Sequence, residues 1–325
     1  MSWEDARSYH GQPVLKEPVW TWEIPCYFFT GGMAGAGAGL AFLAHVRGND
    51  VLARRAWVTS MAGIGASPVL LISDLGKATR FLNMLRMFKP TSPMSVGSWN
   101  LSASGAASTL AAANAWPGLL PRSAAMARPL AALLGLPLST YTAALVSNTA
   151  VPVWHEARDT LPFVFAAGAA LSAGAATAAI TPPEHAAPAR RLALGGAALE
   201  IAAKQLMERR LGEHGQAYKR GGPSAFGRAA EGAILAGAAL MLGRGERSRA
   251  AAVLSGALMC AGALSARWSV YKAGFVSASD PKYVVGPQRE RIQRGQSPGA
   301  ARKQASVEQA ETDRGSPASA GERMG

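Results

Sequence analysis

Residues 24–46 read IPCYFFTGGMAGAGAGLAFLAHV, and His45 is the only ionisable side chain among them apart from Cys26 and Tyr27. A helix needs roughly 20 apolar residues to cross about 30 Å of hydrocarbon, and this stretch is longer. Ten of its 23 residues are Gly or Ala, which allow helices to pack closely in a bilayer. The stretch therefore predicts a membrane-spanning helix.

The rest of the chain repeats this pattern between polar loops. Of its 325 residues, 49% are hydrophobic and only 16% are charged, whereas soluble domains carry about 25% charged residues. Hydropathy and helix-breaking residues predict about eight transmembrane helices. They are Ile24–Val46, Ala56–Ser73, Ser95–Trp116, Pro129–Val153, Leu161–Ile180, Ala186–Leu206, Ala225–Leu242 and Ala250–Ala266. The predicted fold class is an all-α polytopic membrane protein.

Three regions follow from these spans. Residues 1–23 form an N-terminal extramembrane segment, and residues 24–272 form the transmembrane helical domain. Residues 273–325 are predicted to be a polar, largely disordered C-terminal tail. From about Pro287 onward the tail is rich in Arg, Gln, Ser, Gly and Glu, which bury too little apolar surface to offset the ordering entropy.

Charge and cysteine content exclude several function classes. The net charge is +13, but the basic residues punctuate apolar spans and form no dense run with interleaved aromatics, so nucleic-acid binding is not expected. Cys26 and Cys260 both fall in apolar spans, which favours packing over a disulfide or metal site. The Gly-rich run of residues 31–39 lies inside a span rather than after a strand. This position favours helix packing over dinucleotide binding.

One loop is too specific in sequence to be a plain connector. Residues 74–99 read DLGKATRFLNMLRMFKPTSPMSVGSW. The string resembles the loop after the second helix of the NrfD/polysulfide reductase (PsrC-like) membrane subunits, which carry Asp-Leu-Gly, Arg-Phe, Met-Leu-Arg and Ser-Pro-Met-Ser-x-Gly-x-Trp in that order. Residues 20–27, WTWEIPCY, are similar to that family's Trp-x-Trp-Glu-Ile-Pro-x-Tyr start. A third string, from Tyr141 to Trp154, is similar to its Tyr-Thr-Gly…Pro-x-Trp element, with Ala143 in place of the usual Gly.

The resemblance implies an architecture and a function. It implies two four-helix bundles and a quinone-reactive membrane subunit of a respiratory molybdopterin/iron–sulfur oxidoreductase in the cell membrane. The implied partners are a four-cluster, ferredoxin-like iron–sulfur subunit and a molybdopterin catalytic subunit. The bound substrate would be menaquinone or ubiquinone. Basic residues are almost evenly divided between the two sets of loops, so the positive-inside rule gives no orientation; the resemblance implies that the N-terminal face lies outside the cytoplasm.

A quinone site needs an apolar cleft, a hydrogen-bonding group at each carbonyl oxygen and a titratable group that transfers protons. Even alternation of the spans brings the three recognised strings to one membrane surface. The expected quinone-binding side chains are Tyr27, Tyr141 and Trp22, and the expected chemical groups are Tyr141, Asp74, Glu23 and His155. Aromatic-belt, interfacial and salt-bridge roles are the alternatives for these residues. Docking to the iron–sulfur partner is expected from Arg80, Arg86, Lys89 and Trp99.

Three charged residues fall within later spans. Glu200 and Lys204 are four residues apart and can pair along one helix face, and Glu231 lies in the next span. Charges within a span are costly and usually face the bundle interior or water, so these residues form a candidate proton relay. The alternative is that the spans are shifted and leave both acids at the surface.

The sequence also argues against two cofactors. No two histidines occupy matching levels within spans, so a bis-histidine haem is not expected. No cysteine cluster is present in the sequence, so iron–sulfur clusters are expected on a partner. Two other function classes remain open: a secondary transporter of a small solute that uses Glu200, Lys204 and Glu231, and a structural membrane anchor that binds no quinone.

Overall fold

The computed structural model describes residues 15–77, 79–116 and 118–285, and all regular structure within these ranges is helical. Residues 15–279 form one compact unit, and residues 280–285 belong to a second. Eight helices of the described chain have 20 residues or more, which is long enough to cross the hydrocarbon core. They are α1 (Glu23–Val46), α2 (Asp50–Asp74), α4 (Pro93–Ala115), α5 (Pro121–Ser147), α7 (Leu161–Ile180), α8 (Ala187–Arg210), α9 (Gly221–Arg244) and α10 (Arg249–Ser279). The connecting segments contain α3 (Arg80–Leu85), α6 (Pro152–Glu156) and a 3₁₀ helix, η2 (Gly212–Lys219).

Six of these helices are also apolar enough to be candidate membrane spans: α1, α2, α5, α7, α9 and α10. The two long helices outside this set have a more polar composition. Ser, Asn and Gly are frequent in α4, and α8 carries charged residues along its length, including Glu200 and Lys204. The prediction of an all-helical, polytopic membrane protein is confirmed, and hydropathy supports six of the eight predicted spans.

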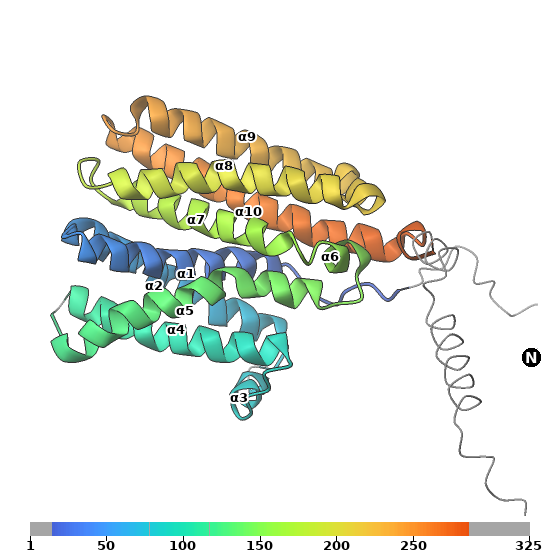
Figure 1. Ribbon diagram of the computed structural model, residues 1–325, viewed down its shortest axis with the longest axis horizontal. Coiled ribbons are helices and arrows are strands. Elements are labelled where there is room, and N and C mark those ends of the chain that lie inside the picture. Colours follow the sequence, from blue (N-terminus) through green and yellow to red (C-terminus); the bar gives the residue numbers. More distant parts are fainter. Residues whose placement is uncertain (1–14, 78, 117, 286–325) are drawn as a thin grey trace, which may run out of the picture. The chain divides into compact units, whose positions relative to one another are not determined.

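The long helices pack as two groups of four (Figure 1). In the first group α1 packs on α2 and α5, and α4 packs on the same two helices. In the second group α7 packs on α8 and α10, and α9 packs on the same two. The groups meet mainly through α1 and α7. The implied pair of four-helix bundles is therefore the arrangement of residues 15–279.

Several helix ends differ from those predicted. α2 begins at Asp50 rather than Ala56, because the Asn49 side chain accepts a hydrogen bond from the Leu52 backbone N–H (3.1 Å) and caps the helix there. α10 continues to Ser279 rather than ending near Ala266, and residues 273–279 are therefore helical rather than part of a polar tail. The predicted disordered segment 287–325, like residues 1–14, lies outside the described part of the chain.

The Gly-rich run of α1 lets neighbouring helices approach closely. A Cβ at Gly35 would lie 2.3 Å from the Gly135 carbonyl oxygen of α5, and a Cβ at Gly135 would lie 2.4 Å from the Gly35 carbonyl oxygen. A Cβ at Gly37 would similarly crowd the Ser60 backbone of α2, at 3.2 Å. The interpretation of this run as helix packing is confirmed.

Gly35→Ala should destabilise the first bundle because its Cβ overlaps backbone atoms, which cannot rotate away. Overpacking of this kind costs about 1–3 kcal/mol. Gly39→Ala is the matched control on the same helix, because a Cβ there meets nothing within 4 Å. Thermal unfolding of the purified protein in detergent measures both variants. If Gly35→Ala and Gly39→Ala unfold at the same midpoint temperature, the α1–α5 contact has room for the additional Cβ and the prediction is wrong.

Candidate functional site

The first cluster of predicted residues lies at one end of the first bundle. This end carries the start of α1, the end of α2, the start of α4 and the last turns of α5, and it is the right-hand end in Figure 1. We call it the N-terminal face. The helix ends meet here because each of these helices reverses direction with respect to the one before it, so residues distant in sequence become neighbours.

Two phenols form the buried part of this cluster. The hydroxyl groups of Tyr27 on α1 and Tyr141 on α5 hydrogen-bond to each other, and their rings meet edge to face with centroids 6.3 Å apart. Tyr27 is completely buried. Gly97 of α4 makes the room for Tyr141, because a Cβ at this position would lie 2.1 Å from the Tyr141 ring. The glycine of the Ser-Pro-Met-Ser-x-Gly string therefore has a steric role.

Two carboxylates at the same face, those of Asp74 and Glu23, share one hydroxyl partner. The Thr21 hydroxyl is within hydrogen-bonding distance of Asp74 Oδ1 (2.9 Å) and also of Glu23 Oε2. A hydroxyl has a single hydrogen, so Thr21 can donate fully to only one of them at a time. Thr21 thus links the end of α2 to the start of α1.

A small cavity joins the two parts of the cluster. Its volume is about 60 Å³, and its walls include Trp20, Asp74, Met84, Met94, Ser98 and Tyr141. This is the space of about two water molecules at roughly 30 Å³ each. The walls combine apolar and thioether surface with one phenol and one carboxylate, so the cavity has the polar groups that a quinone carbonyl and its proton need.

Of the predicted quinone-site residues only Asp74 and Tyr141 line this cavity; Glu23 and Tyr27 contact its neighbours as described above, and Trp22 and His155 do not. Trp22 is 57% exposed, and it is Trp20 that lines the cavity. His155, on α6, is exposed, and its Nδ1 lies 3.3 Å from the Ser147 carbonyl oxygen. Neither side chain is among those that form the walls.

Sequence reasoning missed the residues that hold Trp20 in place. The Trp20 ring stacks on Trp154 at 5.5 Å, and Trp154 Nε1 donates to the Val270 carbonyl oxygen (2.8 Å). Tyr271 donates its hydroxyl hydrogen to the Trp20 carbonyl oxygen. The available signals were the Trp at position 20 in the first string and Trp154 in the third. Tyr271 gives none, because it lies beyond the predicted span Ala250–Ala266, whereas α10 continues to Ser279.

The expected docking residues lie on or beside α3. Arg80, Arg86 and Lys89 are exposed, and none of the three forms an ion pair within the described chain. Trp99 is 40% exposed and meets Phe88 edge to face at 6.3 Å. The segment therefore presents positive charge and exposed apolar side chains together on the N-terminal face.

A second cluster of charges lies inside the other bundle. Glu200 of α8 and Arg267 of α10 are each 2% exposed, with Glu200 Oε1 3.5 Å from Arg267 Nη1. Arg267 Nη2 donates to the Phe165 carbonyl oxygen (3.1 Å), and its guanidinium lies 4.4 Å from the Phe165 ring centroid. A Cβ at Gly168 would lie 2.1 Å from Arg267, so this glycine provides the space for the guanidinium.

The pairing predicted for this cluster is wrong. Glu200 and Lys204 do not form an ion pair in the described chain. Lys204 instead contacts Glu231 of α9 (2.9 Å) and Glu208 one turn along α8 (3.8 Å). The alternative that Glu200 lies at the surface is also wrong, because α8 extends from Ala187 to Arg210 and Glu200 is buried between helices. Arg267 was missed because the last span was ended at Ala266.

Metal binding has no candidate group in the described residues, because no three His, Cys, Asp or Glu side chains lie close enough to hold an ion.

The comparison with curated proteins gives no match. A model of the NrfD-type polysulfide reductase family matches residues 8–279, which is most of the chain and includes both bundles and the loop between α2 and α4. The membrane subunits of this family bind quinone. The chain belongs to the NrfD polysulfide reductase family of membrane subunits.

Proposed function

We propose that this protein is the quinone/quinol-reactive membrane subunit of a respiratory molybdopterin/iron–sulfur oxidoreductase. The observation that carries the proposal is one cavity, at the N-terminal face, whose wall includes both the Tyr141 phenol and the Asp74 carboxylate. Family membership supports the same function. Electrons would pass between membrane quinone and an iron–sulfur partner, since the sequence contains no cysteine cluster of its own.

The two phenols have different roles in this proposal. Tyr27 is fully buried, and within the described residues Tyr141 is the hydrogen-bond partner of its hydroxyl, so it donates to Tyr141 and orients it. Tyr141 then has its own hydrogen free for a quinone carbonyl oxygen in the cavity. Removing one partner of such a buried, neutral hydrogen bond costs about 1–3 kcal/mol of binding free energy.

The carboxylates transfer the protons. Quinol oxidation releases two protons with two electrons, and a base must lie within reach of the substrate hydroxyl. Asp74 lines the cavity, and Thr21 connects it to Glu23. Asp74 would therefore accept the proton and Glu23 would pass it toward the surface.

The cavity must enlarge to admit a quinone ring, because it has room for only about two water molecules. Met84 and Met94 form part of its wall, and methionine side chains change conformation easily because they have three rotatable bonds. Both lie on or near the α3 segment. Substrate entry and partner docking would therefore involve the same part of the protein.

The experiment that tests this function compares two activities of the assembled complex. One is quinol-dependent electron transfer, and the other uses a soluble dye that bypasses the membrane subunit. Tyr141→Phe and Asp74→Asn should lose only the first. A secondary transporter or a structural anchor that binds no quinone would keep both activities in both variants.

The exposed α3 segment is proposed to dock the ferredoxin-like iron–sulfur subunit, and through it the molybdopterin subunit. Arg80, Arg86 and Lys89 suit acidic or carbonyl acceptors, and Trp99 adds apolar area. In the proposed orientation this face lies outside the cytoplasm.

The double variant Arg80→Ala/Arg86→Ala should weaken partner binding by about three- to thirtyfold, because each exposed charge contributes at most about 1 kcal/mol. Affinity of the purified subunits is measured at two salt concentrations, and the loss should be smaller at the higher one. Arg54→Ala/Arg122→Ala, which removes two exposed charges at the opposite end, is the matched control. Unchanged affinity of the α3 variant would exclude this docking surface.

The charges of the second bundle are proposed to form a proton relay. Glu200 lies ten residues from the end of α8, or about 15 Å along the helix axis, which is near the middle of the membrane. Lys204 lies one turn closer to the N-terminal face and contacts Glu208 and Glu231. The relay would carry protons between Glu200 and that face.

A further inference from the structure

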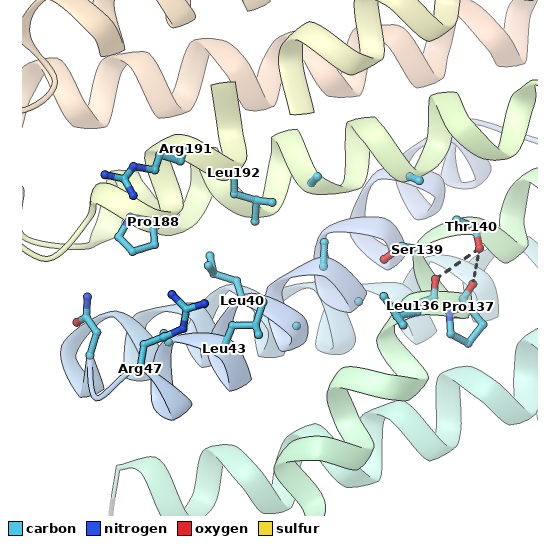
Figure 2. A pocket seen from close by; sticks show the side chains of 17 residues that line it. Leu40, Leu43, Arg47, Leu136, Pro137, Ser139, Thr140, Pro188, Arg191 and Leu192 are labelled. Atoms are coloured by element: carbon cyan, nitrogen blue, oxygen red, sulfur yellow. Dashed lines mark hydrogen bonds between the residues drawn. The ribbon is translucent and has the colours of Figure 1, made fainter. Parts of the chain in front are cut away.

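A large groove lies away from the quinone cavity, toward the opposite end of the helices (Figure 2). Its volume is about 1030 Å³, and residues of α1, α5, α7 and α8 line it. The proposed function uses none of these residues. Most of its walls are apolar, including Leu40, Leu43, Leu136 and Leu192.

One end of the groove is positively charged. Figure 2 shows Arg47 and Arg191 together at one end, with Leu136 and Pro137 at the other. Neither guanidinium has an ion pair or a side-chain hydrogen bond within the described chain. Arg190, the neighbour of Arg191, is by contrast paired with Glu246 (2.8 Å). Two unpaired guanidinium groups at the mouth of an apolar groove suit a ligand with an anionic head and an apolar body.

The length of the groove matches one leaflet of a bilayer. Its lining runs from Gly35 on α1 to Arg47 at the C-terminal cap of that helix, a rise of twelve residues or about 18 Å. Half of the hydrocarbon core is about 15 Å. The exposed side chains of Leu43 (58%) and Leu136 (67%) lie at its walls, so the groove is open sideways to lipid.

We propose that this groove binds one anionic glycerophospholipid of the leaflet opposite the N-terminal face. The phosphate lies between Arg47 and Arg191, and the acyl chains extend along α1, α5, α7 and α8. Because α1 and α5 belong to one bundle and α7 and α8 to the other, the lipid fills the space where the two bundles meet. This proposal does not depend on the quinone site.

The experiment counts lipids bound to the purified full chain by native mass spectrometry, during titration with phosphatidylglycerol, phosphatidylcholine or inorganic phosphate. We expect one tightly bound phosphatidylglycerol and no comparable binding of the other two. Each basic residue near a headgroup raises the lipid-binding constant about fivefold. The double variant Arg47→Ala/Arg191→Ala should therefore weaken phosphatidylglycerol binding by roughly thirtyfold. Arg54→Ala/Arg122→Ala removes two exposed charges from the same face and should change it little.

A second pair of variants fills the groove without touching the charges. A Cβ at Gly39, which lines the groove, meets nothing within 4 Å, so Gly39→Leu should place its side chain in the groove and displace the lipid. Gly195→Leu makes the same change at an exposed position of α8 that is equally open. The proposal is overturned by equal phosphatidylglycerol binding in the two leucine variants, by equal binding of phosphatidylcholine to the natural protein, or by loss of quinone rather than phospholipid in Gly39→Leu.

Discussion

Tyr141→Phe should lower the quinol-dependent activity of the assembled complex by about five- to hundredfold, the equivalent of one lost hydrogen bond of 1–3 kcal/mol in a buried site. Asp74→Asn should have an effect at least as large, because it removes the base that lines the cavity. Activity with a soluble dye should stay unchanged in both variants. The dye reaches the partner subunits without using the Tyr141 cavity.

Matched variants separate this chemistry from general damage. Tyr218→Phe removes the hydroxyl of another buried tyrosine, in η2, away from the cavity. Asp159→Asn removes an exposed carboxylate of the α6–α7 connection. Both should retain quinol-dependent activity. Tyr27→Phe should show a smaller loss than Tyr141→Phe, because Tyr27 orients the other phenol and does not line the cavity. Equal losses in all of these variants would contradict the assignment of Tyr141.

Arg267→Met should lower the free energy of unfolding by about 3–5 kcal/mol, because it leaves the Glu200 carboxyl buried between helices without its ion-pair partner. The double variant Glu200→Met/Arg267→Met should recover most of this loss, because apolar side chains of similar volume often replace a buried ion pair without net cost. Denaturant titration in detergent micelles measures the natural protein, the single variants Arg267→Met and Glu200→Met, and the double variant. Additive losses in the double variant would show that the two groups do not interact.

The same pair tests the proton relay. Glu200→Gln keeps the shape of the side chain and removes its ionisable proton. In proteoliposomes that contain the complex, it should reduce the number of protons moved per quinol and leave electron transfer to the dye intact. Arg228→Gln, at an exposed site on α9 where the guanidinium donates to the Ser224 hydroxyl, is the control. If Glu200→Gln moves as many protons per quinol as the natural protein, the Glu200–Arg267 pair has only a structural role.

Much of the site could be predicted from the sequence, because it depends on which helix ends share a membrane surface. The helices alternate in direction, so the spans alone bring Glu23, Asp74 and Tyr141 to one end. The helix-packing role of the Gly-rich run was also readable, because glycines inside an apolar helix allow neighbouring backbones to approach, as Gly35 and Gly37 do here. Family resemblance was visible in three short strings, and it agrees with the family match over residues 8–279.

Only the tertiary structure decided which side chains meet. In a bilayer the outer surface of a helix is as apolar as its packed surface, so periodicity in the sequence does not reveal which face points inward. Lys204 therefore appeared to be the partner of Glu200, because sequence spacing shows only neighbours three or four residues apart on the same helix. In the folded protein the rotation of α8 and α10 instead brings Arg267 to Glu200, and the crossing of α8 and α9 brings Glu231 to Lys204. The groove beside Arg47 and Arg191 likewise exists only where the two bundles meet.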